Sequence, residues 1–121
     1  MDRPTILKRL KLHDESLLAW VYNHIAQRCA EHGSRPIWIY LPPLQPTAGE
    51  PEERGRAREL AEAAGFKIID LTGIFDGEDV DSLSLEAWDR HPNALAHARI
   101  AERIYDAMKA QPEAFGLPPL Q

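Results

Sequence analysis

The chain has 121 residues, of which 44% are hydrophobic and 27% are charged, and its formal net charge is −5 at pH 7. This length and apolar content suit one globular domain with a core of its own. A nucleic-acid-binding face needs clustered basic residues, so the acidic balance argues against a nucleic-acid partner. The single cysteine, Cys29, excludes an internal disulfide, and no apolar run approaches the roughly 18 residues of a membrane span.

Basic residues are most concentrated near the N-terminus. Four of them alternate with isoleucine and leucine residues there, namely Arg3, Lys8, Arg9 and Lys11. This pattern indicates a solvated edge of the structure rather than a membrane or RNA patch. The apolar core and cleavage site of a secretory signal are not found, so we expect a cytoplasmic protein, provided that Met1 is the natural start.

The middle of the chain predicts a parallel βαβ unit. A helix over about residues 15–32, ended by Gly33, leads into residues 36–41, a continuous apolar run typical of a strand covered on both faces. A second helix begins near Pro51 and ends at Gly65, and a second strand follows over residues 66–71. Strand, helix and strand within about 35 residues force parallel pairing of the two strands.

Residues 92 to about 109 predict a C-terminal helix. Pro92 is expected at its first position, where a missing N–H costs nothing. The periodicity predicts one apolar stripe, which would place His97 in the interior. The expected stripe consists of Ala94, His97, Ala98, Ala101, Ile104, Tyr105 and Met108.

The predicted fold class is α/β, a partial three-layer α/β/α arrangement of flavodoxin-like kind formed by residues 1–121 as one domain. Two strands that are buried on both faces need neighbours at their edges. We therefore expect the domain to be incomplete in this chain. The missing strands would come from an upstream part of a longer protein, from another polypeptide or from a second copy.

The stretch most suited to chemistry reads Trp88-Asp89-Arg90-His91-Pro92-Asn93. A carboxylate placed two residues before an imidazole can orient the ring while the ring exchanges protons with a substrate. The alternative is that Asp89 and His91 only cap the last helix, in a non-catalytic binding or oligomerisation module. His97 could join them as a metal ligand, but no fourth ligand stands at a recognised spacing, so neither a metal nor a cofactor is expected.

The stretch from Asp89 to His97 resembles the last sequence block of the SGNH hydrolases, also called GDSL esterases and lipases, which precedes their C-terminal helix. The order of the predicted elements is similar to the second half of that family's domain. The resemblance implies an SGNH-hydrolase-like fold and serine ester hydrolysis, with His91 as general base and acid and Asp89 as its orienting carboxylate. The implied substrate is an ester of a carbohydrate, a lipid or a small acyl group.

The nucleophile that this chemistry requires is missing from the sequence. The family's Gly-Asp-Ser turn and its oxyanion glycine and asparagine are not found, and none of four serines follows a strand in such a turn: Ser16, Ser34, Ser82 and Ser84. We therefore expect the chain to be inactive alone, because nucleophile and oxyanion donors supply most of the rate. A second rival to the hydrolase is a small flavodoxin-like or receiver-like domain, which would bind a phosphate group. No phosphate-binding glycine loop follows either strand, and neither Asp70 nor Asp76 stands with a second acid as a phosphoacceptor site requires.

Overall fold

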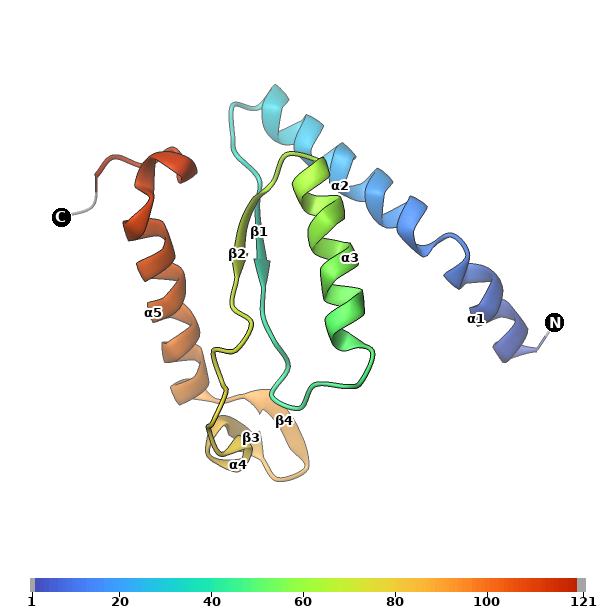
Figure 1. The fold of residues 1–121 in the computed structure, drawn as a ribbon, viewed down its shortest axis with the longest axis vertical. Coiled ribbons are helices and arrows are strands. Elements are labelled where there is room, and N and C mark those ends of the chain that lie inside the picture. The colour runs from blue at the N-terminus through green and yellow to red at the C-terminus, as the bar shows by residue number, and fades with distance from the viewer. Residues whose placement is uncertain (1, 120–121) are drawn as a thin grey trace.

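The structure, a computed structural model, describes residues 2–119 as a small parallel sheet with helices on both sides (Figure 1). Its helices are α1 (Arg3–Lys11), α2 (Asp14–Glu31), α3 (Glu50–Ala63), α4 (Val80–Leu83) and α5 (Ala94–Ala110), followed by a short 3₁₀ helix, Pro112–Phe115. Its strands are β1 (Ile37–Tyr40), β2 (Lys67–Asp70), β3 (Ser84–Glu86) and β4 (Asp89–Pro92). The chain is therefore a mixed α/β protein.

The parallel βαβ unit predicted from the sequence is confirmed. Strands β1 and β2 pair in parallel, with Ile37 opposite Lys67 and Tyr40 opposite Asp70, and α3 connects them. Gly65 follows α3 with a φ of +94°, a left-handed backbone conformation that reverses the chain into β2. Both strands run toward the end of the molecule that holds β3 and β4 (Figure 1).

Alternate residues of the two strands face different helices. Ile69 and Leu71 pack with Ile100 of α5 in one buried cluster, which Ile37 also contacts. On the opposite face, the indole Nε1 of Trp38 donates to the hydroxyl of Tyr22 in α2 at 2.9 Å. The sheet therefore lies between α2 and α3 on one side and α5 on the other.

The expectation that both strands are covered on both faces is wrong for β1. Ile39 and Leu41 keep 40% and 51% of their surface exposed, although Ile37, two residues earlier, packs against the α5 cluster. The physical reason is the width of the sheet: among residues 2–119, β1 has β2 as its single strand neighbour. The apolar run in the sequence exceeds what two strands and one helix can cover.

The sequence did not predict a β-hairpin that comes between β2 and α5 in chain order. β3 and β4 pair antiparallel, with Ser84 opposite Pro92 and an irregularity between Ser84 and Glu86. Pro92 therefore ends a strand, and its expected place at the first position of the last helix is wrong. Asn93 is the N-cap of α5, and its side-chain oxygen accepts from the amide of Ala96 at 3.1 Å.

The C-terminal helix is confirmed, but its predicted buried stripe is right only for Ile104 and Met108 and wrong for its other five residues. The residues of α5 that face the core are Ala96, Ile100, Ile104, Ala107 and Met108. His97 and Tyr105 are exposed, so His97 is no interior histidine. Alanine recurs so often in α5 that two apolar stripes overlap, and the cap at Asn93 together with the contact to Ile69 selects the one that is buried.

Candidate functional site

Asp89 and His91 form a hydrogen-bonded pair on strand β4. Asp89 Oδ1 lies 2.5 Å from the ring Nδ1 of His91 and also accepts from the backbone amide of His91 at 3.1 Å. The carboxylate thus fixes both the position and the orientation of the ring. Within residues 2–119, the ring's other nitrogen, Nε2, has no hydrogen-bond partner.

The two side chains differ in their access to solvent. The His91 side chain is 82% exposed, whereas that of Asp89 is 28% exposed. The hydrogen bond from the His91 ring, and after it the bond from the His91 amide, lowers the pKa of the Asp89 carboxyl below its ordinary value. Asp89 is therefore a carboxylate at neutral pH, and it faces an imidazole that solvent and ligands can reach.

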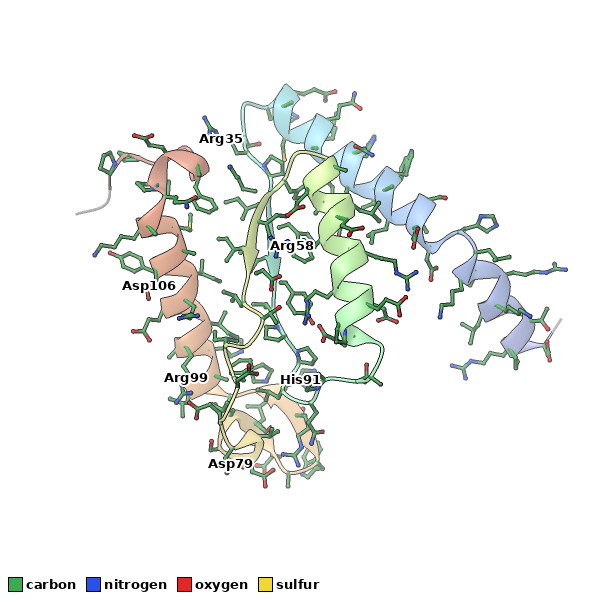
Figure 2. All side chains as sticks on the ribbon, viewed as in Figure 1. Arg35, Arg58, Asp79, His91, Arg99 and Asp106 are labelled. Carbon is green, nitrogen blue, oxygen red and sulfur yellow. The ribbon has the colours of Figure 1, made fainter. Side chains whose placement is uncertain are left out.

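His91 lines a groove at the carboxyl end of β1. One wall is the segment after that strand, residues 41–45, and the other is the segment 88–92, which carries both members of the pair. The groove has a volume of about 650 Å³. Figure 2 labels His91 at this end of the molecule, next to the ends of the strands. Open α/β folds gather ligands at the carboxyl ends of their strands.

The hairpin that carries the pair is held at both ends. Arg90 forms an ion pair with Asp81 just after the start of α4. Asn93 donates from its side-chain amide to the carbonyls of Ser82 at 2.8 Å and Ser84 at 3.2 Å, while its oxygen caps α5. These bonds connect α4, β3 and α5, so the place of His91 depends on all three elements.

A polar cluster supports the other wall of the groove. Glu50, at the first position of α3, accepts hydrogen bonds from the Tyr40 hydroxyl and from Arg54, whose Nη1 lies 3.0 Å away. Tyr40 ends β1 and Glu50 begins α3, so this contact closes the loop that contains Pro42 and Pro43. Two consecutive prolines restrict the backbone further and make this wall stiff.

The serines considered as nucleophiles are engaged elsewhere or lie outside the groove. Ser84 is buried and donates to the carbonyl of Val80 at 2.7 Å, and Ser82 donates to the carbonyl of Asp79 at 2.7 Å. Ser34 donates to the carbonyl of Cys29, and Ser16 lines a separate groove between α2 and α3. None of the four lines the groove of His91.

Metal ligation finds no support in the part of the chain that the structure describes. No three histidine, cysteine, aspartate or glutamate side chains come together there in a way that could hold an ion. Three acids around the start of α4 have other partners: Glu78 pairs with Arg99, Asp79 caps α4 and Asp81 pairs with Arg90.

The sequence reading identified Asp89 and His91 but missed two contributors to their setting. Asn93 belongs to the stretch singled out for chemistry, but its position three residues before the first buried alanine of α5 is typical of an N-cap. Trp88 carries the most exposed large apolar side chain of the described residues, and it lines the groove directly beside the pair. An exposed tryptophan gives no periodic signal, so only the structure could place it.

Comparisons with known proteins add no assignment. Protein-family models, curated proteins and solved structures were searched, and none of the three comparisons produced a match. Among the described residues, no helix has both the length and the apolar character needed to cross a membrane.

Proposed function

We propose that the chain supplies the acid–base pair of an SGNH-type serine ester hydrolase. His91 acts as general base and then general acid, Asp89 orients it, and a serine from outside residues 2–119 acts as nucleophile. The observation that carries the proposal is the bond between Asp89 Oδ1 and His91 Nδ1, at 2.5 Å, beside a groove at the strand ends.

The proposed chemistry uses each of these features. Because Nδ1 is held by the carboxylate, Nε2 is the nitrogen that takes a proton from the serine hydroxyl. The carboxylate then stabilises the imidazolium, and Nε2 returns the proton to the leaving alcohol. The absence of a partner for Nε2 supports this role, since the hydroxyl would occupy that side of the ring.

We also propose a place for the substrate and a source for the nucleophile, which needs strands added to the β1–β2 sheet. An ester of a carbohydrate, a lipid or a small acyl group would lie in the groove between residues 41–45 and residues 88–92. The free edge of the sheet and the exposed Ile39 and Leu41 suit additional strands. Those strands would come from an upstream segment, another polypeptide or a second copy, and would bring the serine and oxyanion donors.

The test is ester turnover with and without the completing strands. The chain alone should neither hydrolyse p-nitrophenyl acetate beyond the rate of free imidazole nor react with a fluorophosphonate. Joined to a segment that carries a Gly-Asp-Ser turn and restores the sheet, it should do both.

His91→Ala should then lower kcat by at least about 10³-fold. The control is His97→Ala, an exposed histidine of α5 outside the groove, which should leave the rate unchanged. Equal rates for His91→Ala and the unsubstituted protein would reject the assigned role.

A binding or oligomerisation module is the second candidate, and the exposed Ile39 and Leu41 favour it. The helix-capping role that this alternative gave to Asp89 and His91 is filled by Asn93. A stable symmetric dimer that buries the β1 edge and shows no turnover would support this candidate.

A further inference from the structure

α1 stands apart from the rest of the described chain. Figure 1 shows it, in blue, extending from the body beyond the start of α2, and none of its residues is buried. The helix is capped at its N-terminus, where the Asp2 side chain accepts a hydrogen bond from the amide of Thr5 at 3.2 Å. A helix so short is marginal by itself in water, so a surface that binds one of its faces would stabilise it.

The two sides of α1 differ in chemistry. Leu7 and Leu10 follow Ile6 by one and four positions, so the three side chains lie on one side of the helix. Ile6 is 43% exposed, Leu7 55% and Leu10 58%. Lys8 and Arg9 lie away from this side. Lys11, four residues after Leu7, lies at its edge, and Arg3, three residues before Ile6, lies at its N-terminal end. Leu12, directly after α1, and Leu17 and Trp20 of α2 are exposed as well.

The charge of α1 is opposite to that of the chain. Residues 2–11 hold four basic side chains and one acid, whereas the whole chain carries −5. The one acid, Asp2, is used as the helix cap. The next acids along the chain, Asp14 and Glu15, begin α2 and line one groove with Lys11, and Glu15 is paired with Arg56 at 3.0 Å. Within α1 itself, the positive charge is therefore not balanced by acidic side chains.

We propose that α1 binds the surface of an anionic phospholipid bilayer, with Ile6, Leu7 and Leu10 among the headgroups and Lys8, Arg9 and Lys11 at the phosphates. An apolar side flanked by lysine and arginine is the pattern of a helix that lies in the membrane interface. A nucleic acid would neutralise the cations but leave the three apolar side chains in water, so lipid fits both halves of the helix. This role is independent of the hydrolase proposed above. It replaces the solvated edge that the sequence alone indicated for these basic residues, because the structure shows that they share one helix with three exposed apolar side chains.

Vesicle flotation tests the proposal with the whole chain. We expect binding to vesicles of phosphatidylcholine mixed with phosphatidylserine, weaker binding to phosphatidylcholine alone, and loss of binding as salt rises. Replacing Lys8, Arg9 and Lys11 by glutamine should weaken partitioning on the order of 10²-fold. Arg103→Gln, at an exposed position of α5, is the charge control and should have no such effect.

The apolar contribution has a matched pair of variants. Leu7 and Leu85 are equally exposed, at 55%, but only Leu7 lies in α1. Leu7→Ser should weaken vesicle binding roughly tenfold, whereas Leu85→Ser should not. Circular dichroism should show that each variant is folded, because α1 contributes nothing to the core.

Four results would overturn the proposal. Three of them are no binding to either kind of vesicle, equal binding to both kinds, and equal effects of Leu7→Ser and Leu85→Ser. The fourth is a dimer in light scattering that the α1 variants dissociate, since the apolar side would then be covered by a second copy of the chain.

Discussion

Trp38 of β1 and Tyr22 of α2 are joined by a hydrogen bond of 2.9 Å between the indole Nε1 and the phenol oxygen. The pair is partly buried, and the Tyr22 ring also packs against Phe66, with 5.4 Å between the ring centroids. This hydrogen bond holds α2 against the sheet, because it joins two residues that are 16 positions apart in sequence.

Tyr22→Phe keeps the ring and removes the acceptor of this bond. We expect the free energy of unfolding to fall by about 1–3 kcal/mol, because the indole N–H is left unpaired in a partly buried place. Urea denaturation measures the change. Tyr105→Phe, on the exposed side of α5, is the control and should change stability by less than about 0.5 kcal/mol.

The acid sensitivity of the fold should depend on Asp70. Burial raises the pKa of this carboxyl, but hydrogen bonds from Thr72 and Arg58 outweigh burial and lower the pKa below its ordinary value. A carboxyl whose pKa is lower in the folded state stabilises the fold above its unfolded pKa, and this contribution is lost as the pH falls through the folded pKa. Asp70→Asn should therefore flatten the loss of stability in acid, as measured by unfolding at a series of pH values.

Asp106→Asn serves as the control for that experiment. Asp106 is exposed on α5, where Figure 2 labels it, and it forms no ion pair with any residue from 2 to 119. Asp106→Asn should therefore not change how the free energy of unfolding falls as the pH is lowered. If Asp70→Asn and Asp106→Asn gave the same profile, the bonds to Thr72 and Arg58 would have no role in acid unfolding.

Asn93→Ala should destabilise the site end of the molecule. The variant loses the cap of α5 and two bonds to the carbonyls of Ser82 and Ser84, so we expect a loss of about 2–3 kcal/mol in unfolding free energy. Asn93→Ser keeps a cap acceptor and loses only the amide donors, so its loss should be smaller. Equal losses in the two variants would show that the cap contributes nothing.

The bond between Asp89 and His91 should fix the tautomer of the neutral imidazole. A carboxylate that accepts from Nδ1 holds the proton there, so nitrogen NMR of His91 should report the Nδ1–H form. In Asp89→Asn we expect a mixture of the two tautomers. Arg90→Gln, which removes the neighbouring ion pair with Asp81, leaves the carboxylate in place and should keep the single tautomer. The Nε2–H form in the unsubstituted chain would contradict the observed geometry.

Local sequence patterns predicted the βαβ unit and the helices beside it. They failed where contacts between residues distant in sequence determine the structure. The strands, the helix between them and the glycines that end helices followed from apolar runs and turn chemistry. The β3–β4 hairpin did not, because its strands are short and polar, and Pro92 equally suits the start of a helix. The buried stripe of α5 depended on contacts with Ile69 and Leu71, which an alanine-rich sequence does not encode locally.

The candidate pair was found because its two members are two residues apart in the chain. The groove was not, since its walls come from segments more than 40 residues apart, and only the parallel pairing of β1 and β2 brings them to one end of the molecule. The serine partner stays a prediction, because the proposal places it outside the described residues.

One wall of the groove is joined through three buried side chains to α4 and α5, the helices that precede and follow the hairpin of the other wall. Leu44 comes from the wall after β1, Leu83 from α4 and Ala96 from the first turn of α5, and together they form one apolar cluster. Ala96 has no exposed surface, so even one added methylene there would push the proline segment and the histidine hairpin apart. The size of molecule that this crevice admits is thus set by interior packing as much as by the residues that line it.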